Sequence, residues 1–63
     1  MKKRQREVFE ALKKLGGEAT TQEIASYLGI VTKGINRTLK DIKNIQHLSD
    51  KGDQSKWKIK TNN

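Results

Sequence analysis

Basic and amide side chains recur between Thr32 and Lys43 at the spacing of one helix face. Ile35, Leu39 and Ile42 lie four and three residues apart, which is the spacing of the buried stripe of an amphipathic helix. With that stripe turned inward, the outward row consists of Thr32, Lys33, Asn36, Arg37, Lys40 and Lys43. Lysine and arginine donate hydrogen bonds to phosphate oxygens, and asparagine can contact either a phosphate or a base edge. The row therefore predicts a helix that binds a polyanion.

The distribution of charge agrees with this prediction. The 63 residues hold 14 Lys and Arg against 7 Asp and Glu, for a formal net charge of +7. Residues 33–63 carry eight basic and three acidic side chains, a net charge of +5, whereas residues 1–32 carry +2. Such an excess is typical of nucleic-acid-binding proteins, although a lysine-rich surface can also serve only to keep a small protein in solution. Asp41 lies off the row, so the row lacks the mixed charge of an ordinary solvated helix face.

Two further helices are predicted upstream of this row. The first runs from about Arg4 to Leu15, where apolar side chains recur at helical spacing, and a Gly-Gly pair ends it. Residues 18–20 follow and are too few to bury a surface by themselves. The second helix begins after its N-cap, which is Thr21, or else Thr20 with Glu23 as the reciprocal partner of a capping box.

The second helix and the polar row together match a helix-turn-helix. Ala25 is small where the next helix crosses, and Gly29 supplies a left-handed turn after Leu28. Thr32 is the predicted N-cap of the third helix, and Gly34 within that helix is expected to allow a close approach. The seam between the two helices is formed by Ile24, Leu28, Ile30, Ile35 and Leu39. A plain helical hairpin with a glycine turn is the alternative, but it does not account for the polar row.

The last third of the chain changes to the period of β-strands. Ile45–Ser49 is a predicted strand, residues 50–55 have turn chemistry, and residues 56–60 alternate lysine with an apolar residue. In the second strand, Trp57 and Ile59 are expected to point inward and the lysines outward. In the first strand, His47 is expected to be a half-buried structural residue. Because Leu48 falls on the opposite face, burying both aliphatic residues of this strand requires a bulge or an earlier strand start.

Three helices followed by a hairpin define a winged helix-turn-helix, an α+β fold, and the chain is long enough for one such domain over residues 1–63. The tip of the hairpin is then the wing, which reaches the backbone or minor groove beside the third helix. The wing residues expected to contact nucleic acid are Lys51, Gln54, Ser55 and Lys56. Trp57 either packs in the core or combines packing with an N–H directed outward.

The residue types argue against catalysis. The chain has no cysteine, one histidine and no clustered pair of carboxylates, so it lacks the groups for a nucleophile, a general acid–base pair or a metal site. The glycines of Leu15–Glu18 are not followed by the lysine of a phosphate-binding loop. We therefore expect no enzyme activity, no cofactor and no small-molecule substrate.

The apolar stretches also argue against a membrane protein. They are too short to span a bilayer, and the basic N-terminus leads into an amphipathic helix instead of a signal-peptide core. The expected location is intracellular, in the cytoplasm or in the nucleus or nucleoid. The expected partner is double-stranded DNA or RNA.

A set of short motifs resembles one family more closely than the fold class alone. The motifs are Thr20-Thr21, Leu28-Gly29, Lys33-x-Ile35-Asn36-Arg37-x-Leu39 and Trp57-Lys58-Ile59. They are similar to the Zα domains of double-stranded RNA adenosine deaminase and of viral innate-immunity antagonists, over nearly the whole chain. The resemblance implies recognition of left-handed Z-form DNA or RNA by backbone shape, with little reading of sequence. It also implies that Lys33, Asn36 and Arg37 contact phosphates and that Trp57 reaches the backbone through water.

The chain also departs from the Zα pattern. Lys40 stands where the family has a tyrosine that packs on a syn base, and Thr32 stands where it has the first of two lysines. Gln54 and Ser55 stand where the family wing has two prolines, so the pre-shaped wing is lost as well. Two alternatives therefore stay open. One is a winged-helix transcriptional regulator that inserts its third helix into the major groove of B-DNA, and the other is a winged helix used for protein contact.

Overall fold

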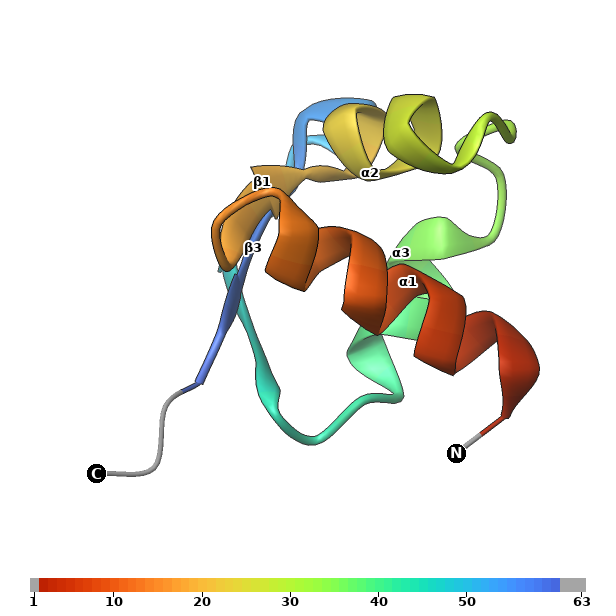
Figure 1. Ribbon diagram of the computed structural model, residues 1–63. Coiled ribbons are helices and arrows are strands. Elements are labelled where there is room, and N and C mark those ends of the chain that lie inside the picture. The colour runs from red at the N-terminus through yellow and green to blue at the C-terminus, as the bar shows by residue number, and fades with distance from the viewer. Residues whose placement is uncertain (1, 61–63) are drawn as a thin grey trace.

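Three α-helices and a three-stranded antiparallel sheet make up the structure, a computed structural model that describes residues 2–60 (Figure 1). The elements in chain order are α1 (Lys3–Lys14), β1 (Glu18–Thr20), α2 (Thr21–Leu28), α3 (Ile35–Lys40), β2 (Ile45–Ser49), the 3-10 turn η1 (Gly52–Gln54) and β3 (Lys56–Ile59). This confirms an α+β fold with three helices and a C-terminal hairpin, in a layout consistent with a winged helix. None of the helices in residues 2–60 has the length and apolar character needed to cross a membrane.

A capping motif stands at each end of α2. At its start, the Thr20 side chain accepts a hydrogen bond from the Glu23 N–H at 3.1 Å, and the Glu23 carboxylate accepts one from the Thr20 N–H at 2.8 Å. This is a capping box, so the second of the two predicted caps is the correct one. At its end, Gly29 is left-handed and the Ile30 N–H donates to the Ala25 carbonyl at 3.0 Å, which closes a Schellman cap. The predicted ends of α2 are confirmed, and α1 agrees with its prediction to within one residue at each end.

α3 is shorter than predicted and starts later. Gly34, predicted inside the helix, precedes it as the N-cap with a φ of +83°, a conformation that residues with a Cβ rarely adopt. The prediction of Thr32 as the N-cap is therefore wrong. The Thr32 carbonyl lies in the turn before α3, where it accepts a hydrogen bond from the Ile35 N–H at 3.1 Å. Close approach does not explain Gly34 either, because nothing lies within 4 Å of the place that a Cβ would take. Ile42 lies beyond the helix end at Lys40 and is nevertheless buried.

β3 is the central strand of the sheet, with β1 and β2 on either side. Three residues are too few to predict β1 from sequence, and it forms because all three pair antiparallel with β3, Ala19 opposite Trp57. On the other edge, His47 in β2 lies opposite the same tryptophan. The register shifts after His47, so of the two alternatives, a bulge or an earlier strand start, the strand has the bulge. It does not bury both aliphatic residues of the strand, because Leu48 stays 42% exposed.

The core lies between the helices and one face of the sheet. Trp57 is its largest fully buried side chain, at 1% exposure, and Ile59 is partly buried, whereas the neighbouring lysines are exposed. The predicted alternation along β3 is therefore confirmed. The residues of the predicted seam between α2 and α3 are all buried or packed against the core, as that prediction requires. The other buried apolar residues are Val8, Ala11, Leu12, Ala19, Ile24, Ala25, Ile35, Leu39, Ile42 and Ile45.

Candidate nucleic-acid interface

The six residues of the predicted row do not share one helix. Those that belong to α3 are Asn36, Arg37 and Lys40. Thr32 and Lys33 lie in the turn before α3, and Lys43 lies in the turn after it. The left-handed Gly34 interrupts the helical spacing upstream, and the early end of the helix interrupts it downstream. The row is therefore a short helix flanked by two turns, which corrects the expectation of one continuous face.

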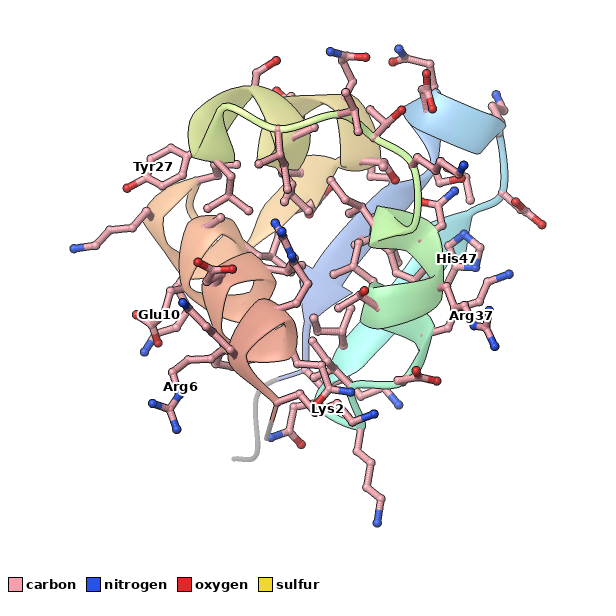
Figure 2. All side chains as sticks on the ribbon, turned by 90° about the vertical axis from the view of Figure 1, so that its right-hand side faces the viewer. Lys2, Arg6, Glu10, Tyr27, Arg37 and His47 are labelled. Atoms are coloured by element: carbon pink, nitrogen blue, oxygen red, sulfur yellow. The ribbon has the colours of Figure 1, made fainter. Side chains whose placement is uncertain are left out.

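Four cationic side chains surround this short helix, and we refer to them as the α3 cations: Lys33, Arg37, Lys40 and Lys43. All four are exposed, and none forms an ion pair with a carboxylate of residues 2–60. Figure 2 shows Arg37 extending from the α3 side of the molecule into solvent. Mutual repulsion of unpaired like charges raises the free energy of the folded state, and an anionic ligand would relieve that repulsion.

Asn36 ties α3 to the hairpin. Its Nδ2 donates to the Gly52 carbonyl at 3.1 Å, and its Oδ1 accepts a hydrogen bond from the Thr21 hydroxyl. The side chain is half-buried, so it stands at the border between the interior and the α3 cations. Of the residues predicted to bind, Asn36 is the one that brings α3 and the hairpin tip together.

Thr21 contributes to this site and was not among the predicted binding residues. Its side chain is fully buried at the first position of α2, and its hydroxyl accepts a hydrogen bond from the Trp57 Nε1–H at 2.9 Å. In the sequence, Thr21 appears as a possible helix cap and as part of the Thr20-Thr21 motif, neither of which indicates a contact with Asn36 or Trp57. Its partners, Asn36 and Trp57, lie 15 and 36 residues away, so no local signal identifies this role.

The hairpin tip, residues 50–55, is held against the start of α2. The Ser55 carbonyl accepts from the Thr21 N–H at 2.9 Å, and the Ser55 Oγ accepts from the Lys51 N–H at 3.0 Å. Ser55 is 0% exposed, and its hydroxyl is enclosed within the tip. The prediction that Ser55 contacts a ligand is therefore wrong. Lys51 and Gln54 remain exposed, as a wing contact requires.

Trp57 is used inside the fold. Its ring is stacked on the His47 ring with a centroid distance of 4.0 Å and an interplanar angle of 7°, and its N–H is directed to Thr21. The prediction that the Trp57 N–H points outward is therefore wrong. Trp57 can affect a ligand only indirectly, through Thr21 and the residues that Thr21 contacts. The half-buried position of His47 is confirmed, and its Nε2 is buried without a hydrogen-bond partner in residues 2–60.

Lys56 lies apart from the α3 cations. It alternates with Trp57 along β3, so it faces the side of the sheet opposite the core. There its Nζ lies 3.0 Å from the Glu18 carboxylate. Of the predicted wing residues, Lys56 is thus the one whose charge is already paired.

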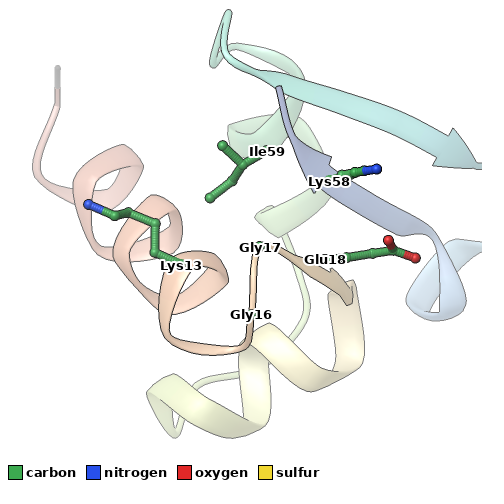
Figure 3. A pocket seen from close by; sticks show the side chains of 6 residues that line it. All are labelled: Lys13, Gly16, Gly17, Glu18, Lys58 and Ile59. Carbon is green, nitrogen blue, oxygen red and sulfur yellow. The ribbon is translucent and has the colours of Figure 1, made fainter. Parts of the chain in front are cut away.

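One open cavity of about 470 Å³ lies elsewhere, between the end of α1 and strands β1 and β3. It is lined by Lys13, Gly16, Gly17, Glu18, Lys58 and Ile59. In Figure 3, Ile59 points toward α1, whereas Lys58 and Glu18 point away from it. The cavity shares no residue with the predicted site.

Comparison of the chain with protein-family models, with curated proteins and with solved structures finds no match. Within residues 2–60, no three His, Asp or Glu side chains gather in a group that could hold a metal ion. What the site can bind follows from its own chemistry. That chemistry is a set of unpaired cations beside an asparagine that is fixed by hydrogen bonds.

Proposed function

We propose that this chain is a winged helix-turn-helix domain that binds double-stranded nucleic acid through α3, the turns beside it and the hairpin tip. The observation that carries the proposal is the set of four exposed α3 cations, none of which has a carboxylate partner in residues 2–60. Nucleic acid offers a dense line of phosphates, and lysine and arginine are the side chains that neutralise it.

The position of the hairpin tip supports this proposal. The hydrogen bond from Asn36 to Gly52 holds the tip beside the start of α3, and Lys51 and Gln54 of this tip are exposed. A helix and a neighbouring loop that both offer cations can contact two phosphate strands or two stretches of one strand. Contact with a protein is less well supported, because the six residues of the predicted row include no aromatic or large aliphatic side chain, and the exposed aliphatic residue beside the row is the single Val31.

We further propose that the preferred duplex is left-handed, as the resemblance to Zα domains implies. The short α3 favours contact with the backbone, since six residues rise only about 9 Å along the helix axis. Both polar atoms of the Asn36 side chain are also engaged within the protein, which disfavours the bidentate contact of asparagine with adenine. The second candidate is major-groove binding of B-DNA, and the observation that favours it is Lys40 in place of the tyrosine that contacts Z-form bases.

A circular dichroism titration tests both parts of the proposal. A short alternating CG duplex and a mixed-sequence duplex of equal length are titrated with the protein at low salt. We expect tight binding to the CG duplex with inversion of its spectrum. Tight binding without inversion, with equal or higher affinity for the mixed duplex, would assign the protein to B-DNA. Absence of binding to both duplexes would refute the nucleic-acid proposal.

A charge-matched control separates the α3 cations from general attraction. Lys14→Gln removes one exposed positive charge at the end of α1 near β1, away from α3 (Figure 1). We expect this variant to bind and invert the CG duplex like the wild-type protein. A loss as large as that of an α3 variant would mean that total charge, and not the α3 surface, determines binding.

A further inference from the structure

The buried hydroxyl of Thr21 is the centre of a series of hydrogen bonds that links the C-terminal hairpin to α2 and α3. The Trp57 indole donates to Thr21 Oγ1 at 2.9 Å, the Thr21 hydroxyl donates to Asn36 Oδ1, and Asn36 Nδ2 donates to the Gly52 carbonyl at 3.1 Å. The series therefore joins β3, α2, α3 and η1 through three side chains. Trp57 and Thr21 are fully buried, and only Asn36 reaches toward the surface.

The two ends of this series fix its direction. An indole nitrogen can only donate and a backbone carbonyl can only accept, so the atom of Asn36 that faces Gly52 must be Nδ2. Asn36 Oδ1 then faces Thr21, whose single hydroxyl proton points to it, while the hydroxyl oxygen accepts from the indole. The alternative acceptor for that proton, the Ser55 carbonyl, lies at the longer distance of 3.5 Å. One arrangement of protons therefore satisfies every group.

This arrangement determines what Asn36 can offer at the surface. A carboxamide has two N–H donors, and one of them is engaged by Gly52. Rotating the amide by 180° would bring its Oδ1 against the Gly52 carbonyl, so that two acceptors faced each other, and would force the Thr21 hydroxyl to turn its proton to the more distant Ser55 carbonyl. The second N–H is therefore held in one direction, beside Arg37 and Lys40 on the same helix.

We infer that Thr21 is a positioning residue of the nucleic-acid interface, which together with the Gly52 carbonyl holds the Asn36 amide in one orientation and thereby keeps the hairpin tip against α3. This inference rests on the proposed function for its effect on binding, whereas the orientation itself is a property of the free protein. Thr21 touches no ligand, so its removal acts through Asn36 and the tip.

The variant that tests the inference is Thr21→Val, which keeps the shape of the side chain and removes the hydroxyl. The matched controls are Thr21→Ser, which restores the hydroxyl, and Trp57→Phe, which removes the indole donor and leaves the bond from Thr21 to Asn36. Binding to the CG duplex is measured for each variant at a temperature at which thermal unfolding shows it to be folded. We expect Thr21→Val to weaken binding about tenfold or more, and Thr21→Ser and Trp57→Phe to weaken it less than about threefold.

A double-mutant cycle distinguishes positioning from a general loss of stability. If Thr21 acts through Asn36, adding Thr21→Val to Asn36→Ala changes binding by less than about twofold, although each single change weakens it strongly. Full additivity of the two losses would overturn the inference. Equal losses in Thr21→Val and Trp57→Phe would overturn it as well, because packing would then account for both.

Nuclear magnetic resonance of the free protein tests the orientation without any ligand. In the wild type, we expect the Trp57 indole N–H to exchange slowly with solvent and the Asn36 side-chain amide to give two well-separated proton signals. In Thr21→Val, both sets of signals should move. An indole N–H that exchanges as fast as a free indole in the wild type would refute the series of hydrogen bonds even if Thr21→Val failed to fold. Slow exchange of the indole N–H without binding of either duplex would refute the proposed function but not the hydrogen bonds among Trp57, Thr21 and Asn36.

Discussion

Two surfaces of this molecule carry lysines, and they differ in what surrounds the charge. On the outer face of the sheet, Glu18 lies opposite Lys58 in the register and pairs with Lys56 at 3.0 Å. Around α3, the cations have no carboxylate partner in residues 2–60, and Asn36 beside them is held by two hydrogen bonds. The difference teaches that the number of lysines does not identify an interface. The placement of the acidic side chains and the hydrogen bonds of Asn36 are what distinguish the two surfaces.

Removing Arg37 is expected to have the largest effect on this contrast. Arg37→Ala should lower affinity for the CG duplex by about 10- to 100-fold, because a hydrogen bond to a charged group contributes about 1.5–3 kcal/mol. Lys58→Ala on the sheet should lower it less than about threefold. Fluorescence anisotropy at constant salt measures both affinities, and thermal unfolding checks that both proteins are folded. Equal losses from the two surfaces would remove the distinction between them.

Salt dependence counts the phosphates that each surface neutralises. For contact with about five phosphates, log affinity should fall with log salt at a slope of about −4 to −5. Arg37→Ala should reduce the magnitude of that slope by about 1, and Lys58→Ala should leave it unchanged. The slopes come from the same anisotropy titration repeated over a range of salt concentrations. A slope that falls equally in both variants would place phosphates on the sheet as well as on α3.

His47→Phe tests the support beneath the α3 surface. The substitution keeps a ring stacked on Trp57 and removes the buried Nε2, which has no partner in residues 2–60. Because a buried unsatisfied polar atom costs about 1–3 kcal/mol, the free energy of unfolding should rise by about 1 kcal/mol. Urea unfolding measures this change, and binding should stay within about twofold of the wild type. A fall in stability would mean that Nε2 makes an interaction with water that the ring of phenylalanine cannot replace.

Glu18→Gln should have the smallest effect. Its ion pair with Lys56 joins side chains that are 41% and 48% exposed, so its loss should change the free energy of unfolding by less than about 1 kcal/mol. Affinity for the duplex should rise less than about threefold, because one negative charge is removed from a surface that does not contact the ligand. A larger gain would show that the sheet, once released from its acid, binds nucleic acid too.

The parts of the fold that sequence predicts are those determined by neighbours in the chain. The capping box of Thr20 and Glu23 and the left-handed turn at Gly29 involve residues within a few positions of each other, and both were predictable as helix boundaries. Alternation of lysine with apolar residues likewise gave the correct face to each side chain of β3. The start of α3 was not predictable in the same way, because glycine also occurs inside helices at a cost of about 1 kcal/mol, so the presence of Gly34 alone does not indicate its positive φ.

The candidate site was predicted only in part, since its organisation depends on distant contacts. The exposure of the α3 cations was predictable, because the apolar residues between them recur at the spacing of one buried helix face. The enclosure of Ser55 and the inward direction of the Trp57 N–H were not, because both depend on contacts with Thr21, more than thirty positions away along the chain. β1 was missed for the same reason, as three residues form a strand only when a distant strand pairs with them.

The strand order β1-β3-β2 constrains how the molecule can be assembled. β1 and β2 do not pair with each other in this order, so each is held in the sheet only by its pairing with β3, which follows both in the sequence. That strand also carries Trp57, against which residues from both neighbouring strands pack. The helices can begin to form as the chain leaves the ribosome, but neither the sheet nor the core can close before residues 56–59 have emerged. A chain that stops at the hairpin tip should therefore have no stable tertiary structure.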